Sequence, residues 1–233
     1  MGLDLPHLLQ LISVMALPAI FAITLHEAAH GVVAFRCGDD TAYRQGRVTF
    51  NPLRHIDPFG TVLLPLLLFV VSAGHFFFGY AKPVPVAFAR LRHPRRDMVL
   101  VAIAGPAVNV VLAVVSAALV AVVPYMPVFM GEWLKDNLYN SVFINIILAV
   151  FNMIPLPPLD GGRVAVGLLP EALAVPLART ERYGIMILVA VVVLVPLIGH
   201  SAGFNFNLMA YVMDRPVDYI ESAIQWATGV SYD

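Results

Sequence analysis

Two histidines and a glutamate lie within five positions of an otherwise apolar run, AITLHEAAHGVVAF at residues 22–35. On a helix, His26 and His30 are four positions apart, so both imidazoles project from one face and can bind one metal ion. Glu27 lies one step around the helix, where its carboxylate can take a proton from water beside the ion. The spacing therefore predicts a metal-dependent hydrolytic site.

The apolar surroundings strengthen this interpretation. An ionisable side chain inside a membrane helix costs on the order of 2.5–3.5 kcal/mol on insertion scales, so three of them within five residues need a reason. A single histidine in a membrane span commonly bonds to a neighbouring helix, and a single glutamate commonly pairs with a cation or lines a proton path. The three together at this spacing favour a metal site.

A third ligand is needed, because a catalytic zinc usually takes three protein ligands and keeps one position for water. The stretch FNMIPLPPLDGGR at residues 151–163 supplies a candidate. Its prolines cannot continue a helix, so the apolar segment breaks just before Asp160 and presents that carboxylate. Asp160 is the predicted third ligand. The alternative is that Asp160 caps a helix beginning near Arg163.

The composition is that of a membrane protein. Of the 233 residues, 60% are hydrophobic and 12% are charged, and the mean hydropathy is +0.83, whereas soluble domains are about one-quarter charged. The net charge of −1 and the absence of a basic run argue against nucleic-acid binding. We expect a single membrane-embedded domain over residues 1–233, with a catalytic core at about 8–170 and C-terminal helices at about 179–230.

Each membrane span needs about 20 apolar residues. Five long apolar segments stand out, at about residues 8–35, 59–80, 98–123, 142–169 and 183–198. The tail at about 205–230 carries charges among apolar residues at helical spacing, which predicts an interfacial amphipathic helix, with a sixth span left open. The predicted fold class is an all-α polytopic membrane protein with five or six transmembrane helices.

The cations predict how the second apolar segment runs. Twelve of the 14 Lys and Arg residues fall in the loops at 36–56, 81–97 and 163–182, and the first two of these loops flank residues 59–80. Cytoplasmic loops collect Lys and Arg, so residues 59–80 are predicted to be re-entrant or a hairpin between the first and second spanning core helices. The HEAAH motif and Asp160 then both lie towards the cytoplasm.

Several motifs together resemble one family. HEAAH, GPAVN at 105–109 and NMIPLPPLDGGR at 152–163 resemble the site-2 protease family of intramembrane zinc metalloproteases. The stretches GDDTAYRQGRVTFNPLRHIDPFGT at 38–61 and GYAKPVPV at 79–86 are similar to its compact prokaryotic branch, which lacks PDZ and CBS domains. The resemblance implies that His26, His30 and Asp160 bind Zn²⁺ and that Glu27 is the general base and acid.

The resemblance also implies roles for two asparagines. Asn152 would be a polar group near the scissile peptide, and Asn109 would face the site from the third apolar segment. From the residues alone, Asn152 could instead satisfy carbonyls freed by the proline break, and Asn109 could form an interhelical hydrogen bond. For Asn109 both interpretations remain open.

The segment YAKPVPVAF could contact a substrate. Pro83 and Pro85 lack N–H donors on one edge of an extended chain, so the amides of Lys82, Val84 and Val86 remain on the other edge. These three amides are predicted to pair with an unwound substrate strand by β-augmentation. The alternative is a proline-stiffened connector.

We therefore expect an intramembrane zinc metalloprotease that cleaves peptide bonds in or near transmembrane segments of membrane-protein or peptide substrates. It would be a multi-pass protein of the prokaryotic inner membrane, embedded in the lipid bilayer, with its active site towards the cytoplasm. The alternatives are a membrane metal transporter or sensor, or an inactive scaffold, with the same ligands. The presence of Glu27 favours the enzyme. The ligand set favours zinc but also suits other divalent ions.

Overall fold

The structure is a computed structural model that describes residues 5–63, 67, 82–195 and 208–230. Within these ranges the chain is helical and contains no strand. In chain order the elements are α1 (Leu5–Arg36), α2 (Thr41–Arg44), η1 (Pro52–Arg54), η2 (Pro58–Leu63), η3 (Phe88–Arg90), α4 (Pro94–Leu119), η4 (Val120–Tyr125), α5 (Val128–Asn152), α6 (Asp160–Leu168), α7 (Glu171–Arg179), α8 (Glu181–Val189), η5 (Ala190–Leu194) and α10 (Leu208–Thr228).

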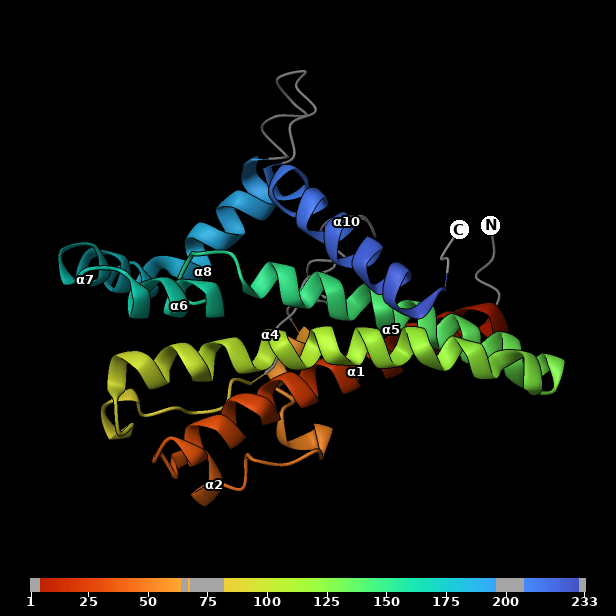
Figure 1. The fold of residues 1–233 in the computed structure, drawn as a ribbon, viewed down its shortest axis with the longest axis horizontal. Helices are drawn as coiled ribbons and strands as arrows, with labels where there is room; N and C mark the ends of the chain where they lie inside the picture. Colours follow the sequence, from red (N-terminus) through yellow and green to blue (C-terminus); the bar gives the residue numbers. More distant parts are fainter. Residues whose placement is uncertain (1–4, 64–66, 68–81, 196–207, 231–233) are drawn as a thin grey trace.

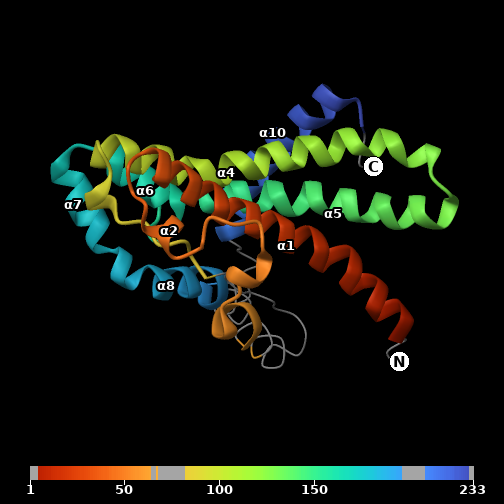
Figure 2. The same ribbon diagram turned by 90° about the horizontal axis from the view of Figure 1, so that it is seen from below.

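Three long helices form the body of the molecule. Helices α1, α4 and α5 lie side by side along its long axis, and each contacts the other two (Figures 1 and 2). α1 and α5 run in the same direction and α4 runs in the opposite one. α6 and α7 lie at one end of this bundle, where α1 and α5 finish and α4 begins.

The packing between α4 and α5 is close because α4 presents small residues to its neighbour. Ala113 and Ala117 are fully buried, and they pack against larger apolar side chains of α5. Small side chains let two helix backbones approach in a membrane. Ile224 of α10 closes the same cluster, whose α5 members are Val142, Ile146 and Val150.

Two of the described helices, Ile12–Arg36 and Pro94–Tyr125, are long and apolar enough to cross a membrane. Large apolar side chains on their outer faces, such as Phe21 and Val111, are more than half exposed, as is expected for helices that contact lipid. The all-helical fold and the membrane class are thereby supported. The prediction of five or six spans and the domain limits stay predictions.

Hydrogen bonds join the end of α1 to the segment that precedes α4. The amide of Arg92 donates to the carbonyl of Cys37 at 3.0 Å, and the amide of Ala87 donates to Oδ2 of Asp39 at 2.6 Å. Burial raises the pKa of Asp39, but hydrogen bonds from Thr41 and Ala87 outweigh this effect and hold the pKa below its ordinary value. The two helix ends are therefore fixed beside each other.

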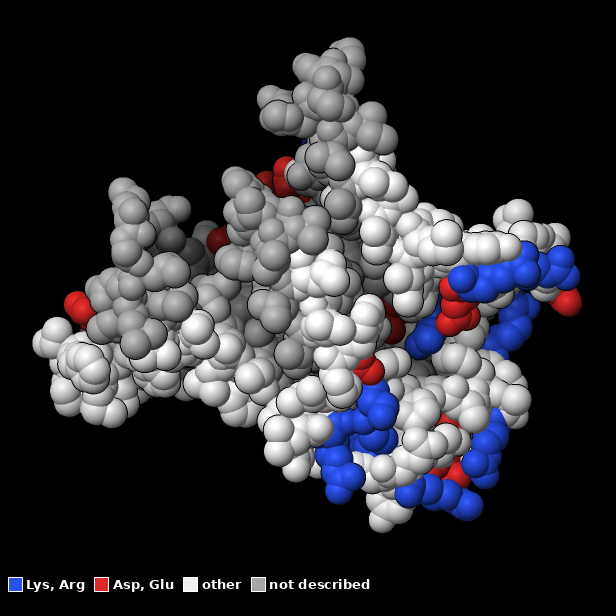
Figure 3. Space-filling view, turned by 180° about the vertical axis from the view of Figure 1, so that it is seen from behind, with Lys and Arg blue, Asp and Glu red and all other residues white. Residues whose placement is uncertain are grey.

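This arrangement is the one expected if the second apolar segment returns to the end of the bundle from which it starts. Residues 64–66 and 68–81 of that segment lie outside the described residues, so the re-entrant path stays a prediction. Lys and Arg side chains gather at the same end of the molecule, around α2, α6 and α7 (Figure 3).

The connection between the apolar segments at 98–123 and 142–169 is much shorter in the structure than the gap between these segments. η4 ends at Tyr125 and α5 begins at Val128, so the charged residues Glu132, Lys135 and Asp136 lie on α5 and are exposed. The apolar run is shorter than the helix at its N-terminal end, because high hydropathy marks only the part of a helix that is suited to lipid. Likewise, the expected 163–182 loop is largely helical, since α6 and α7 occupy most of it.

Candidate metal centre

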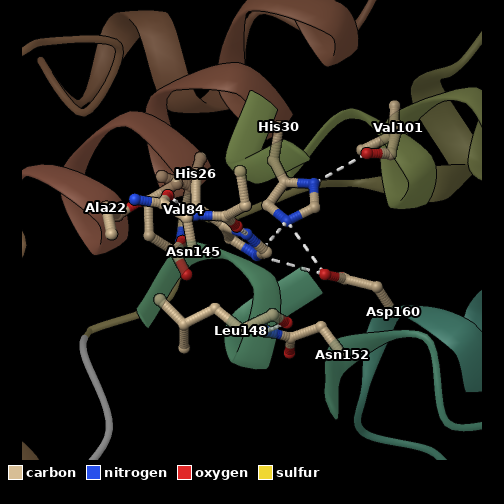
Figure 4. Close-up of polar contacts among 11 residues, drawn as sticks. Ala22, His26, His30, Val84, Val101, Asn145, Leu148, Asn152 and Asp160 are labelled. Carbon is tan, nitrogen blue, oxygen red and sulfur yellow. Dashed lines mark hydrogen bonds and ion pairs between the residues drawn. The ribbon is translucent and has the colours of Figure 1, made fainter. Parts of the chain in front are cut away.

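The structure brings the three predicted ligands together. His26 and His30 project from α1 and are 7% and 8% exposed, and Asp160 at the start of α6 is 6% exposed. Oδ2 of Asp160 lies 3.1 Å from Nε2 of His26 and 3.3 Å from Nε2 of His30, and the two Nε2 atoms are 3.0 Å apart (Figure 4). One donor atom from each residue thus points to a common centre.

The hydrogen bonds on the far side of each ring determine its tautomer. Nδ1 of His30 lies 2.7 Å from the carbonyl oxygen of Val101. A carbonyl can only accept, so Nδ1 of His30 carries a hydrogen, and in the neutral ring that binds a metal Nε2 keeps its lone pair. Metal-binding histidines are commonly oriented by such a bond on the other ring nitrogen.

His26 reaches the same state through an asparagine of α4. Nδ1 of His26 lies 2.5 Å from Oδ1 of Asn109, while Nδ2 of Asn109 donates to the carbonyl of Ala22 at 3.3 Å. Because the Ala22 carbonyl must accept, the amide of Asn109 directs its oxygen to the ring, and Nδ1 of His26 must donate. The Nε2 lone pair of His26 is therefore free as well.

Three lone-pair atoms consequently face one another in a buried position. Apart from the two ring nitrogens themselves, no hydrogen-bond partner reaches Oδ2 of Asp160 within the described part of the chain. Buried acceptors and a buried carboxylate are unfavourable unless a cation lies among them. Two neutral imidazoles and one carboxylate form a donor set typical of catalytic zinc, so the residues present fit Zn²⁺.

The proline break places Asp160 at this centre. α5 ends at Asn152, and the chain turns back so tightly that a Cβ on Gly161 would lie 2.2 Å from the carbonyl oxygen of Met153. The N-cap of α6 is Leu159, with no side chain that caps the helix. The alternative interpretation of Asp160 as a helix cap therefore has no support in the geometry.

Glu27 lies beside the centre and contacts the extended segment that follows the undescribed residues. Its Oε2 accepts a hydrogen bond from the amide of Val84 at 2.7 Å. The amide of Lys82 donates to the carbonyl of His55 at 2.9 Å. Tertiary contacts thus occupy the amides of Lys82 and Val84 in this structure. Substrate pairing along this edge stays a prediction and would have to displace both bonds.

The two predicted asparagines differ in their contacts. Asn109 is fully buried and touches both α1 and the His26 ring, so it forms an interhelical bond and faces the centre at once. Asn152 is half-buried and its Nδ2 donates to the carbonyl of Leu148 at 3.0 Å, one turn earlier in α5. Its predicted role near the scissile peptide stays a prediction.

Sequence reasoning missed Asn145. This side chain is 1% exposed, and its Oδ1 accepts a hydrogen bond from Nδ2 of Asn109 at 2.7 Å. A signal was available, because Asn145 interrupts an apolar run and lies seven residues before Asn152, on the same face of a helix.

A buried His, His and Asp donor set, with a glutamate from an HExxH motif beside it in an apolar helical chain, is typical of membrane zinc metallopeptidases. Comparison with known proteins leads to the same class. The sequence model of Peptidase family M50 matches residues 130–195. No solved structure matches the chain.

Curated relatives extend the match over most of the chain. The chain is 38% identical over 183 residues to "Putative zinc metalloprotease YwhC" of Bacillus subtilis (strain 168), covering 77% of this chain and 80% of the relative. It is 30% identical over 175 residues to "Putative zinc metalloprotease Rip2" of Mycolicibacterium smegmatis, covering 75% of this chain and 64% of the relative. The chain belongs to peptidase family M50, the site-2 protease family. The predicted enzyme class and the zinc cofactor are confirmed.

Gly105 of α4 gives a test of the centre. A Cβ at this position would lie 2.5 Å from Nε2 of both His26 and His30, so Gly105→Ala must displace the imidazoles. We expect its zinc affinity to fall at least about tenfold, as for other changes beside metal ligands, measured by chelator competition.

Gly131→Ala on α5 is the matched control, because the nearest atom to its Cβ would be 3.4 Å away. It should bind zinc as the unmodified protein does. Full zinc affinity in folded Gly105→Ala would contradict the placement of the centre.

Proposed function

We propose that this protein hydrolyses peptide bonds in or near transmembrane segments of membrane-protein substrates. The observation that supports this most is the position of the centre. Oδ2 of Asp160 and the Nε2 atoms of His26 and His30 converge among apolar helices, with Glu27 on the next position of α1. A hydrolytic site buried among apolar helices suits a substrate that itself lies in the bilayer.

His26, His30 and Asp160 would hold the zinc ion, which when bound lowers the pKa of a water to about 7 and polarises the substrate carbonyl. Glu27 would accept the proton of the attacking water on a carboxylate oxygen and return it to the leaving amine. Asn152, eight residues before Asp160, would donate its amide N–H to the oxyanion that develops on the scissile carbonyl. The Nδ2 group has two hydrogens, so one can remain bonded to the Leu148 carbonyl while the other donates to the oxyanion.

The depth of the centre is consistent with this chemistry. His30 lies six residues before the end of α1, which corresponds to about 9 Å along a helix that rises 1.5 Å per residue. The centre is therefore near the end of the bundle where Lys and Arg gather (Figure 3), and water would reach it from that end. We place this end in the cytoplasm, in a multi-pass protein of the prokaryotic inner membrane.

The extended segment before α4 is the candidate contact for substrate. The amide of Val84 donates to Glu27. If a substrate carbonyl took the place of Oε2 of Glu27 as the acceptor of this amide, that carbonyl would lie next to the Glu27 carboxylate. A substrate helix must unwind before cleavage because its carbonyls are otherwise bonded within the helix. Transmembrane proteins or peptides in the bilayer are the substrates that suit this geometry.

Glu27→Gln tests the proposal. The amide cannot take a proton from water, so cleavage of a transmembrane peptide should fall by about 10²–10⁴-fold, the range of general acid–base catalysis. Zinc content should stay near one ion per chain, because Glu27 is not among the converging donors. Both are measured on the purified full chain, by product mass spectrometry and by metal analysis.

The matched control is Glu132→Gln, the same change at an exposed position of α5. It should cleave normally. Undiminished cleavage by Glu27→Gln would contradict the role of the base. A transporter or scaffold would show no cleavage by the unmodified protein, and that outcome would contradict the proposed function.

The orientation has its own test, since Cys37 is the only cysteine. In a Cys37→Ser background, Gln45→Cys places an exposed thiol at the basic end, and Phe129→Cys places one at the start of α5. A membrane-impermeant maleimide should label Gln45→Cys only in inverted vesicles and Phe129→Cys only in intact spheroplasts. The reverse pattern, or labelling of both from one side, would contradict the orientation.

A further inference from the structure

A series of hydrogen-bonded polar side chains, most of them buried, leads from the metal centre into the bundle. His26 of α1 contacts Asn109 of α4, and Nδ2 of Asn109 donates to Oδ1 of Asn145 on α5 at 2.7 Å. Nδ2 of Asn145 donates to the carbonyl of Ser141 at 2.8 Å. This series of polar side chains ends where the hydroxyls of Ser141 and Ser116 lie 2.8 Å apart. It links all three long helices.

Backbone carbonyls fix the direction of the bonds that run from Asn145 through Asn109 to His26, whereas either hydroxyl of Ser116 and Ser141 can donate to the other. The Ser141 carbonyl can only accept, so it holds the NH₂ group of Asn145 and leaves Oδ1 facing Asn109. That oxygen, together with the Ala22 carbonyl, holds the NH₂ group of Asn109. Oδ1 of Asn109 is then the atom that His26 meets.

The reverse orientation would disable the ligand. If the Asn109 amide turned by 180°, its NH₂ group would face Nδ1 of His26, which would have to accept. The ring hydrogen would then move to Nε2, the atom that faces Asp160 and His30. A protonated Nε2 has no lone pair for a metal.

We propose that Asn145 is a positioning residue for the metal centre. It holds the Asn109 amide in the orientation that keeps the hydrogen of His26 on Nδ1 and leaves Nε2 free for the ion. This inference rests on the proposed function only in taking His26 as a zinc ligand. Asn145 touches neither the ion nor the substrate, so its effect passes through Asn109.

The same helix contains a natural comparison. Asn137 is also buried, and its Nδ2 donates to the carbonyl of Trp133 at 2.9 Å, just as Asn145 bonds one turn back. Within the described residues, however, Oδ1 of Asn137 has no partner. Only Asn145 contacts Asn109. If these asparagines acted only by packing within the bundle, replacing either one should change zinc binding to the same extent.

The experiment measures metal binding by the purified full chain. Zinc affinity is obtained by chelator competition, and the ligand field is read from the visible absorption of the Co²⁺-loaded protein. Asn145→Leu removes the side-chain hydrogen bonds to Asn109 and Ser141 but keeps the number and branching of the heavy atoms. It should weaken zinc binding about tenfold, the lower end for residues behind metal ligands, and alter the Co²⁺ bands. Asn137→Leu should match the unmodified protein in both.

A conservative replacement should restore binding. The buried carboxyl of Asn145→Asp is expected to be neutral, so its carbonyl oxygen can accept from Asn109 and its hydroxyl can donate to Ser141. We expect zinc affinity within about twofold of the unmodified protein, well inside the penalty that a lost outer contact gives. If Asn145→Leu does not fold, Asn145→Ala gives the same comparison.

A double-mutant cycle tests whether Asn145 acts through Asn109. In an Asn109→Leu background the positioning contact is already lost, so adding Asn145→Leu should not weaken zinc binding further. Three results would overturn the proposal. These are additive losses of zinc affinity in the double mutant, equal losses of affinity in Asn145→Leu and Asn137→Leu, and unchanged affinity in folded Asn145→Leu. None of these outcomes bears on cleavage by Glu27→Gln, so the two proposals fail separately.

Discussion

The convergence of three lone pairs is the constraint on which the structure depends. Nε2 of His26, Nε2 of His30 and Oδ2 of Asp160 lie within 3.3 Å of one another, and each is buried among apolar helices. Without a cation, this arrangement combines lone-pair repulsion with the cost of burying a carboxylate. When zinc is bound, the same three atoms coordinate the ion and thereby link α1 to the start of α6.

The surrounding fold can be understood as what holds those atoms in place. α4 supplies a glycine where the imidazoles need room, a carbonyl that orients His30 and an amide that orients His26. α5 carries the polypeptide back to the end of the bundle where α1 finishes, and its proline break then turns Asp160 inward. Between the three long helices, the polar contacts of Asn109, Asn145 and Ser141 lead to the centre.

Much of this was predictable from local sequence pattern. The spacing of His26 and His30 places both on one helical face whatever the tertiary structure, and the prolines before Asp160 end a helix by covalent geometry. The hydrogen bond between Val84 and Glu27 and the contact between Asn109 and Asn145 could not be derived in this way. Both join segments far apart in the sequence, and no local pattern specifies such pairs. The start of α5 was also missed, because exposed charges on a helix resemble a loop in a hydropathy profile.

X-ray absorption at the zinc edge of the metal-loaded protein tests the ligand set directly. If His26, His30 and Asp160 hold the ion, the spectrum should show two imidazole nitrogens and oxygen ligands at about 2.0–2.2 Å, with one imidazole lost in His26→Ala and in His30→Ala. Asp160→Ala should retain both imidazoles but bind zinc more weakly. A spectrum with fewer than two imidazoles in the unmodified protein, or one that none of these variants changes, would contradict this ligand set.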